Sequence, residues 1–276
     1  MENIIPGVPV TVAPSVVRIT APNPGVMTGP GTNSYVVGSR ELAVIDPGPA
    51  IESHVAALRG AVGERLKWIV CTHTHLDHSP AAVLLQRATG ARIAGRPAPQ
   101  DGRQDAQFSP ERTLADGDSI SLDGVTLRAV HTPGHASNHL CYLFEERKLL
   151  FTGDHVMQGS TVVISPPDGD MQAYLASLEK LLALDLLGLA PGHGHVITQA
   201  HDEARRLIAH RLKREQKVAD ALAHRHPAKL EELVPLAYDD VAERLYPIAQ
   251  RSLHAHLIKL AREGRAHETA GGWIPA

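Results

Sequence analysis

The sequence predicts a mixed α/β domain followed by a small C-terminal domain of helices and a β-ribbon. Up to about residue 130, short β-type runs alternate with helical stretches, and beyond about residue 170 apolar residues recur at helical spacing. The chain has 276 residues, of which 43% are hydrophobic and 21% charged, so it can bury a substantial core and is not expected to be disordered. One large domain or two unequal ones both fit this length.

The α/β part contains β-type and helical patterns in alternation. We expect strands over residues 15–20, 34–37, 42–46, 67–72 and 125–130, and helices over 51–62 and 80–89. Pro80 suits the first turn of the second helix. Two hairpins are also expected, one joining 119–122 to 125–130 through Asp123 and Gly124, and one joining 139–144 to 148–152.

The C-terminal part follows a winged-helix pattern. Helices are expected over 171–184, 199–224, 230–237 and 252–263, and a small ribbon follows over 265–274. In the last helix Leu253, Leu257 and Leu260 form an apolar stripe that faces a core. We therefore predict a main domain over 1–198, a connecting helix over 199–224 and a winged-helix domain over 225–276.

Charge, cysteine content and hydropathy exclude several classes of protein. Lys and Arg number 27 against 30 Asp and Glu, so a net charge of −3 provides no overall basic field for nucleic-acid binding. Cys71 and Cys141 lie in apolar runs and are expected to be reduced core residues. Residues 1–16 lack the features of a signal peptide, and no apolar run reaches the roughly 18 residues that span a bilayer. We expect a cytoplasmic protein with no membrane partner, and the oligomeric state stays open.

Histidine is unusually frequent, with 17 residues against 10 Phe, Trp and Tyr combined, and several lie in one segment. Residues 72–78 read Thr-His-Thr-His-Leu-Asp-His and follow the apolar run 68–71. If the chain is still extended at His73 and His75, one metal can take both side chains, because a strand has a period of two. Asp77 and His78 fall where the chain turns toward the next helix, so they can serve a second metal.

Three further residues of ligand type each follow an apolar run, namely His135, Asp154 and His193. Loops beyond the carboxyl ends of strands collect at one edge of an α/β sheet, so we expect four loops to converge on one cluster. The alternative is that these histidines are ordinary polar residues. That alternative would bury several imidazoles and two carboxylates without a cation, which is energetically costly.

The order of these residues resembles the metallo-β-lactamase superfamily, whose signature is H-x-H-x-D-H followed by an isolated His, an Asp and a last His. The resemblance implies a metallo-β-lactamase αβ/βα sandwich, a hydrolase domain, over residues 1–198. It also implies that two zinc ions are bridged by Asp154, the first bound by His73, His75 and His135 and the second by Asp77, His78 and His193.

The resemblance bears on several neighbouring residues as well. It suggests that Asp46 orients a ligand, while a turn-initiating role before Pro47 and Gly48 fits this residue equally well. Four histidines adjoin the expected ligands, and a structural or ligand-orienting role is expected for each: His131, His139, His155 and His195. Eight others, including His54 and His256, look like ordinary surface or helix-face residues.

Two zinc ions would lower the pKa of a shared water toward neutrality, so a metal-bridging hydroxide would serve as the nucleophile. Asp77 is expected to be both a ligand and the catalytic group that orients the water or carries its proton. A bridging carboxylate at Asp154, which true β-lactamases lack, disfavours antibiotic hydrolysis. Mixed His and Asp ligands favour zinc, with manganese or iron as alternatives.

Further segments resemble the β-lactamase-like protein 2 group, in which a winged-helix domain follows the hydrolase domain: 31–35, 164–174, 191–194 and 253–265. The mitochondrial animal member of that group is described as an endoribonuclease acting on single-stranded RNA, which makes RNA the first candidate substrate. Hydrolysis of a small ester substrate, namely an acyl thioester as in glyoxalase II or a lactone, is the alternative. A binding or regulatory protein that keeps the fold is the non-enzyme alternative.

Charge in the C-terminal part bears on these alternatives. Residues 199–276 carry 13 Lys and Arg against 11 Asp and Glu, a net of +2, whereas residues 1–198 have a net of −5. A winged helix that grips duplex DNA normally carries a clearer basic excess, so duplex DNA is not an expected partner. Four basic residues lie in its last helical stretch against one acid, Glu263: Arg251, Lys259, Arg262 and Arg265. The domain is expected either to wall off the hydrolase cleft or to contact RNA.

Overall fold

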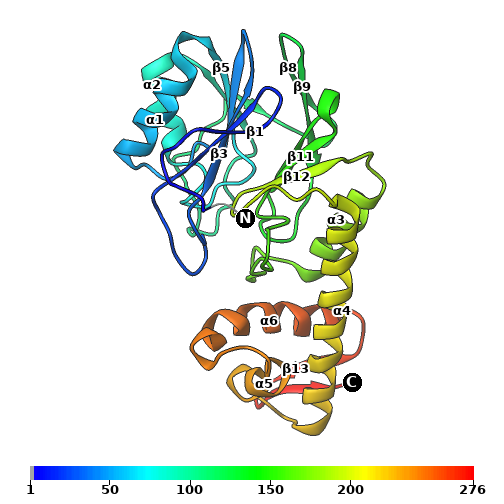
Figure 1. The fold of residues 1–276 in the computed structure, drawn as a ribbon. Helices are drawn as coiled ribbons and strands as arrows, with labels where there is room; N and C mark the ends of the chain where they lie inside the picture. The colour runs from blue at the N-terminus through cyan, green and yellow to red at the C-terminus, as the bar shows by residue number, and fades with distance from the viewer. Residues whose placement is uncertain (1–2) are drawn as a thin grey trace. The chain divides into compact units, whose positions relative to one another are not determined.

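The computed structural model describes residues 3–276, which form two compact units. The first unit contains the residues up to 132 together with 138–161 and 185–200, and the second contains 133–137, 162–184 and 201–276. Figure 1 follows the chain from the strands of the first unit to the helices near the C-terminus. The domain boundaries proposed at residues 198 and 224 stay predictions.

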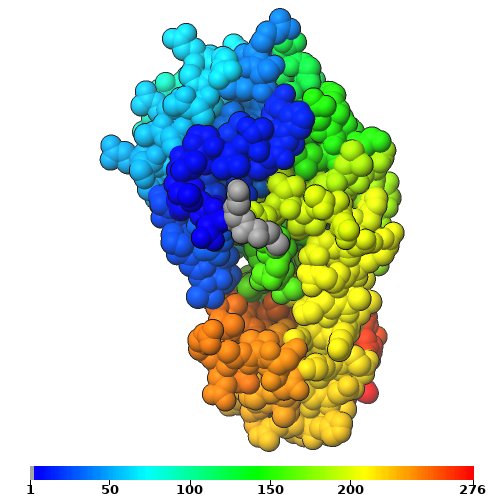
Figure 2. All heavy atoms as spheres, viewed as in Figure 1, coloured from blue at the N-terminus to red at the C-terminus, as the bar shows by residue number. Residues whose placement is uncertain are grey.

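A seven-stranded sheet, whose spatial order follows the chain from β1 to β7, forms one layer of the first unit. Antiparallel pairing joins its first four strands: β1 (Val10–Ala13), β2 (Val16–Thr20), β3 (Asn33–Gly38) and β4 (Leu42–Ile45). Parallel pairing then adds β5 (Leu66–Val70), β6 (Arg92–Gly95) and β7 (Arg112–Thr113). The edge strand β1 is partly exposed, and the dark blue N-terminal segment lies at the surface in Figure 2.

A five-stranded sheet in the order β12-β11-β10-β9-β8 forms the second layer of this unit. Its strands are β8 (Ser119–Leu122), β9 (Val125–His131), β10 (Leu140–Phe144), β11 (Leu149–Gly153) and β12 (Gly188–Pro191). Both predicted hairpins are present, as β8 with β9 and β10 with β11. Only the pairing of β11 with β12 is parallel in this sheet.

Apolar side chains of both sheets fill one core between the layers, among them Val37 and Ile45 from the first sheet and Tyr142 and Phe151 from the second. Helices α1 (Glu52–Val62) and α2 (Ala81–Thr89) connect the parallel strands of the first sheet and pack on its other face through Leu58 and Leu85 (Figure 1). Strands β4, β10 and β11 are buried along their whole length, which explains their continuous apolar sequences.

The second unit contains α3 (Met171–Leu182), nearly all of α4 (Ala200–His224), α5 (Leu230–Ala237) and α6 (Tyr246–Arg262). The strands β13 (Ala266–Thr269) and β14 (Gly272–Pro275) form its terminal ribbon. Leu222, Leu233, Leu257 and Trp273 share a core that joins the end of α4 to α5, α6 and the ribbon. The predicted winged-helix order of elements is therefore confirmed.

Several details differ from the sequence prediction. Helix α6 begins at Tyr246 rather than near Ser252, because Pro247 stands in its first turn, where a missing N–H breaks no helical hydrogen bond. Strands β1, β6 and β7 have two to four residues each and were not predicted. The expectation that His54 and His256 are ordinary surface or helix-face residues is wrong, because both are fully buried.

Within residues 3–276, no helix combines the length and the apolar character needed to cross a membrane.

A buried ionic cluster in the second unit is centred on Glu215. Lys259 Nζ donates to Glu215 Oε1 at 2.8 Å, and the two side chains are only 10% and 5% exposed. His256 Nδ1 lies 3.2 Å from Glu215 Oε2. We expect Glu215→Gln to lower the free energy of unfolding of this unit by about 3 kcal/mol, because Lys259 loses its buried counter-charge. Guanidinium unfolding followed by the fluorescence of Trp273, in a Trp68→Phe background, measures the loss.

Glu263→Gln is the matched control for this prediction. Glu263 accepts from the same Lys259 ammonium at 2.7 Å, but its side chain is 34% exposed, so we expect a loss below about 1 kcal/mol. Equal losses of unfolding free energy in the two variants would contradict the larger contribution that we assign to the buried Glu215.

His54 should make the first unit sensitive to mild acid. Its Nε2 lies 2.8 Å from Ser34 Oγ, and burial lowers the pKa of His54 to about 4. The unfolded chain, with an ordinary histidine pKa near 6.5, therefore binds more protons as the pH falls, and the folded state loses stability. We expect His54→Gln to reduce the loss of unfolding free energy between pH 7 and pH 5 by about 2 kcal/mol. Denaturant titrations of both proteins at the two pH values test this, and equal losses would contradict it.

Candidate metal centre

The loop after β5 carries the first predicted ligands. Strand β5 ends at Val70, two residues before the predicted end, so His73 and His75 lie in the loop beyond the strand. Their rings nevertheless converge, with His73 Nε2 2.8 Å from His75 Nδ1 and the ring centroids 4.6 Å apart. His73 is buried and His75 is partly exposed. The two imidazoles are therefore adjacent, as predicted, although strand geometry is not the cause.

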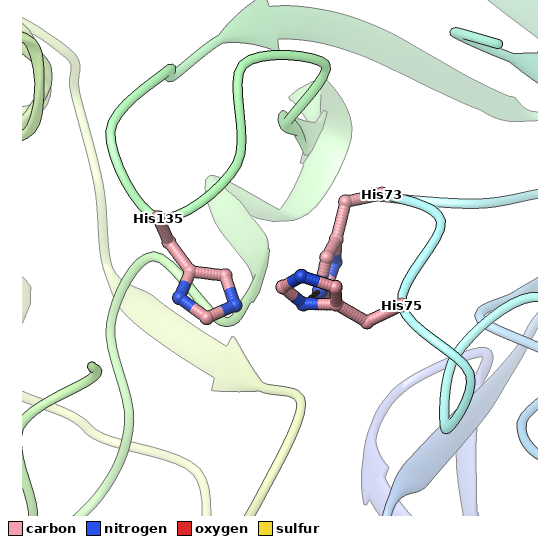
Figure 3. Close-up of side chains that lie close together, drawn as sticks. All are labelled: His73, His75 and His135. Atoms are coloured by element: carbon pink, nitrogen blue, oxygen red, sulfur yellow. Dashed lines mark hydrogen bonds between the residues drawn. The ribbon is translucent and has the colours of Figure 1, made fainter. Parts of the chain in front are cut away.

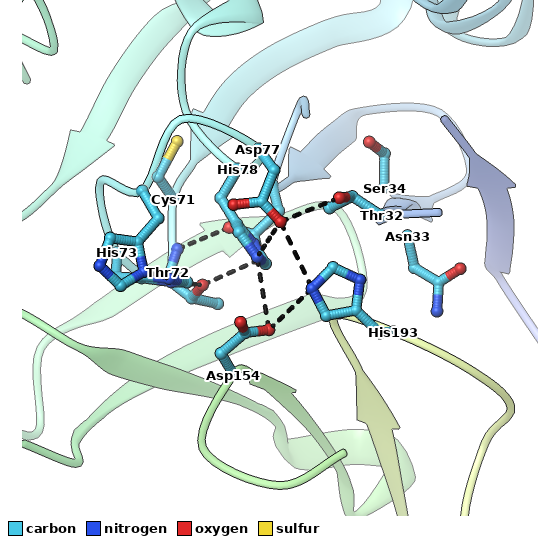
Figure 4. Close-up of polar contacts among 12 residues, drawn as sticks. Thr32, Asn33, Ser34, Cys71, Thr72, His73, Asp77, His78, Asp154 and His193 are labelled. Atoms are coloured by element: carbon cyan, nitrogen blue, oxygen red, sulfur yellow. Dashed lines mark hydrogen bonds and ion pairs between the residues drawn. The ribbon is translucent and has the colours of Figure 1, made fainter. Parts of the chain in front are cut away.

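Asp77 and His78, the next polar residues of this loop, meet His193 of the loop after β12. His78 Nε2 and His193 Nε2 each lie 3.4 Å from Asp77 Oδ2. Figure 4 shows the three side chains pointing toward one another. Their ligand atoms all lie within 4.8 Å of one another, so this group could hold a metal ion.

Asp154, directly after β11, lies against the same two imidazoles (Figure 4). Its Oδ1 is 3.3 Å from His78 Nε2 and 3.2 Å from His193 Nε2. A further group that could hold a metal joins Asp154 to His73 and His78. The close approach needs a glycine at position 192, because a Cβ there would lie 2.8 Å from both Asp154 Oδ1 and His78 Cε1. Asp154 thus adjoins one group and belongs to another.

His135 completes the predicted ligand set. Its Nδ1 lies 2.8 Å from the carbonyl oxygen of Val163. One ring nitrogen from each of His73, His75 and His135 falls within 4.8 Å of the others, and Figure 3 shows the three rings gathered together. All seven residues predicted as ligands therefore occur in three overlapping groups.

Hydrogen bonds behind the imidazoles determine which ring nitrogen faces the cluster. Asp46 accepts from Thr72 N at 2.7 Å and from Thr72 Oγ1 at 2.8 Å, and its Oδ2 also accepts from His78 Nδ1 at 3.0 Å. Because the only hydroxyl proton of Thr72 goes to Asp46, His73 Nδ1 donates to Thr72 Oγ1, 3.0 Å away. In His73 and His78 the lone pair is therefore on Nε2, toward the cluster. The backbone of Asp46 has a φ of 50°. Its hydrogen bond with His78 Nδ1 orients a candidate ligand, as the sequence resemblance suggested.

The electrostatics of the cluster favour a cation. Burial opposes protonation of His78, but the charges of Asp77, Asp154 and Asp46 outweigh burial and raise the pKa of His78 well above its usual range. Burial also opposes protonation of His193, but the nearby carboxylates, Asp154 above all, outweigh it and raise the pKa of His193 to about 10. Divalent ions would supply the same positive charge with both imidazoles neutral.

His73 differs from these two imidazoles. Burial, together with the neighbouring rings of His78, His75 and His139, lowers the pKa of His73 well below its usual range. A neutral imidazole is the form that binds a metal, so His73 needs no proton removed before it can do so.

The donor atoms fit a metal ion better than a hydrogen-bond network. Among the residues that the structure describes, the buried His78 Nε2 and His193 Nε2 have no partner in hydrogen-bond geometry, although carboxylate oxygens lie 3.2 to 3.4 Å away. Imidazole nitrogens combined with carboxylate oxygens suit zinc, iron and manganese. The residues present therefore fit a metal centre.

The four histidines that adjoin the ligands in sequence separate into two pairs. His139 and His155 are fully buried, and the ring of His139 lies 5.0 Å from that of His73 and 6.1 Å from that of His155, between centroids. His131 and His195 are partly exposed. Only the first pair thus lies deep beside the cluster. Sequence reasoning gave no role to Thr32 and Asn33, which contact the loops of Asp77 and His193.

Comparison with known proteins places this geometry in a family. Residues 27–193 match the family described as metallo-beta-lactamase superfamily, and residues 230–273 match the family described as beta-lactamase associated winged helix domain. The first match covers more than half of the chain and spans all seven candidate ligands.

Relatives and solved structures agree with both matches. The chain is 31% identical to "Beta-lactamase-like protein 2 homolog" of Drosophila melanogaster over 91% of this chain and 89% of the relative. It is 33% identical to "Atrochrysone carboxyl ACP thioesterase" of Aspergillus chevalieri over 95% of this chain and 86% of the relative.

Two crystal structures of similar proteins were also found. A metallo-beta-lactamase family protein from Thermus thermophilus superposes with a TM-score of 0.81 at 21% identity, covering 96% of this chain and all of the other. The protein TTHA1623, solved in a di-iron-bound form, has a TM-score of 0.55 at 27% identity over 67% of this chain and 96% of the other. The chain therefore belongs to the metallo-β-lactamase superfamily, as a metal-dependent hydrolase whose αβ/βα sandwich is followed by a β-lactamase-associated winged-helix domain.

Proposed function

We propose that this protein is a dinuclear metal hydrolase. The observation that carries the proposal is the overlap of three groups of side chains that could each hold a metal ion. His73 belongs to two of these groups and His78 to two, and together the groups contain all seven predicted ligands. The di-iron form of TTHA1623 supports a pair of ions. Asp154 would bridge the two ions; His73, His75 and His135 would hold the first, and Asp77, His78 and His193 would hold the second. Zinc is the first candidate metal, with manganese or iron as alternatives.

A pair of divalent ions, when bound, supplies a hydroxide nucleophile at neutral pH and polarises the bond to be cleaved. The chain's residues orient the reactants. Asp77 has a side chain that is 27% exposed, against 12% for Asp154, so Asp77 is the carboxylate with better access to solvent. We assign to Asp77 the catalytic role of orienting the attacking water and holding its proton. Asp46 holds His78 with Nε2 toward the centre.

The proposed substrate is an acyl thioester. A relative that is named as an acyl carrier protein thioesterase aligns over 95% of this chain, so the likeness includes both the hydrolase region and the winged-helix region. A thioester offers a carbonyl carbon to a hydroxide and a thiolate leaving group, which the proposed centre can serve without a side-chain nucleophile.

Ion pairs in the second unit support a small substrate over RNA. Of the four basic residues in the last helical stretch, three pair with acids of their own unit: Lys259 with Glu215 and Glu263, Arg262 with Asp170, and Arg265 with Glu215 and Glu263. Binding to a phosphate backbone depends on cations that can neutralise phosphates, and these pairs would compete with phosphate.

Cleavage of single-stranded RNA is the second candidate. It is favoured by the likeness to "Beta-lactamase-like protein 2 homolog" over 91% of this chain, since the resemblance in sequence to that group implies RNA. The same metal centre could act on a phosphodiester, because a hydroxide attacks phosphorus as well as carbon.

Removing the proposed bridge should disable the centre. We expect Asp154→Ala to lower metal content below two ions per chain and to reduce turnover about 100-fold or more, because the pair loses its shared carboxylate. Metal analysis by mass spectrometry, after purification without chelator, and steady-state kinetics measure both effects. Asp185→Ala is the control, since Asp185 is 75% exposed and pairs with Lys148. Normal metal content and turnover in Asp154→Ala would contradict the bridge.

A parallel assay of the zinc-loaded protein discriminates between the two substrates. We expect hydrolysis of an acyl thioester, measured by thiol release, and little cleavage of a single-stranded RNA oligonucleotide. Activity of the chain should vanish on treatment with a chelator and return with added zinc. Cleavage of RNA without thiol release would reverse the order of the candidates.

A further inference from the structure

Two segments that the sequence resemblance singles out lie together in the structure. Residues 31–35 read Gly-Thr-Asn-Ser-Tyr and lead into β3, and residues 191–194 read Pro-Gly-His-Gly and contain His193. Asn33 N donates to the carbonyl oxygen of Gly192 at 2.7 Å, and a β-bridge pairs Thr32 with His193. The first segment therefore contacts the loop of a candidate ligand that is about 160 residues away in the chain.

The side chain of Asn33 holds the carbonyl groups on both sides of His193. Its Nδ2 donates to the carbonyl oxygens of Pro191 at 3.0 Å and Gly194 at 2.8 Å, and its Oδ1 accepts from Thr20 Oγ1 at 2.8 Å. The contact with Thr20 fixes the direction of the amide. Asn33 is fully buried, so these hydrogen bonds are protected from water.

The same segment also orients the His193 ring. His193 Nδ1 donates to the carbonyl oxygen of Gly31 at 3.2 Å, which leaves the lone pair on Nε2. That Nε2 is the nitrogen 3.4 Å from Asp77 Oδ2 and 3.2 Å from Asp154 Oδ1. A hydrogen bond behind a ligating imidazole is the arrangement that fixes its tautomer and orientation in metal sites.

Thr32 extends this control to a second candidate ligand (Figure 4). Thr32 Oγ1 accepts from Asn23 Nδ2 at 2.9 Å and donates to Asp77 Oδ2 at 3.2 Å. Asp77 Oδ2 is also the oxygen that lies 3.4 Å from both His78 Nε2 and His193 Nε2. Thr32 is fully buried, so its hydroxyl holds the carboxylate oxygen that faces the imidazoles.

We propose that Gly31, Thr32 and Asn33 form a positioning clamp that assembles Asp77 and His193 into one metal position, so that the clamp controls occupancy of the Asp77, His78 and His193 group. Thr32 and Asn33 are positioning residues that act through Asp77 and His193. The inference rests on the proposed metal centre. It adds that one of the two metal positions has a support of its own, because the hydrogen bonds described for the clamp reach Asp77 and the loop of His193.

The test is a zinc titration of the full chain against a chromophoric chelator. We expect Thr32→Val, which removes the hydroxyl and keeps the branched shape, to weaken one of two zinc sites about 10-fold or more and to leave the other unchanged. Thr32→Ser restores the hydroxyl and should retain both sites. Ser34→Ala is the matched control, because Ser34 lies in the same buried segment but contacts His54, and both affinities should be unchanged.

Asn33→Leu provides a second variant, which should also weaken a single site. Circular dichroism checks whether each variant folds. If Asn33→Leu does not fold, Thr32→Val, the milder change, still tests the clamp. Two wild-type affinities in Thr32→Val, or equal weakening of both sites, would overturn the clamp while leaving the metal centre intact. A wild-type chain that binds no zinc, manganese or iron would overturn the proposed centre itself and the clamp with it.

Discussion

The charge of Asp77 and Asp154, held within 3.4 Å of the Nε2 atoms of His78 and His193, is the constraint on which the site depends. Two carboxylates that face the same imidazoles, Asp154 buried and Asp77 partly exposed, need positive charge close by. Protonated imidazoles can provide it, as the raised pKa values of His78 and His193 indicate, and so can metal ions. Asp46 and the Gly31 carbonyl accept hydrogen bonds from His78 Nδ1 and His193 Nδ1, which turns both Nε2 atoms toward this charge, as the proposed ligation of a metal requires.

The fold brings these groups together because the loops after β5, β11 and β12 leave the carboxyl ends of their strands. Strand β11 pairs in parallel with β12, so Asp154 and His193 emerge side by side from one sheet. The loop after β5 in the other sheet contributes Asp77 and His78. The two sheets pack through a shared apolar core, which fixes the distance between these loops. Gly192 then permits the final approach of the β12 loop to Asp154 and His78.

The sequence predicted the parts of the structure that depend on residue type and order. Ligand-type residues after apolar runs were recognisable because few other roles require so many imidazoles and carboxylates at strand ends. Strand β7, with two residues, is too short to show a period, and the start of α6 was hidden by Pro247. The burial of His54 and the clamp at Asn33 were not predictable, since both depend on side-chain contacts between segments, in the second case 161 residues apart.

We propose that seven side chains from four loops form one centre for two metal ions. The most direct measurement is anomalous diffraction from crystals of the zinc-loaded protein at the zinc absorption edge. We expect two peaks, one among Asp77, His78 and His193 and one among His73, His75 and His135, with Asp154 in contact with both. A single peak, or peaks away from these residues, would contradict it.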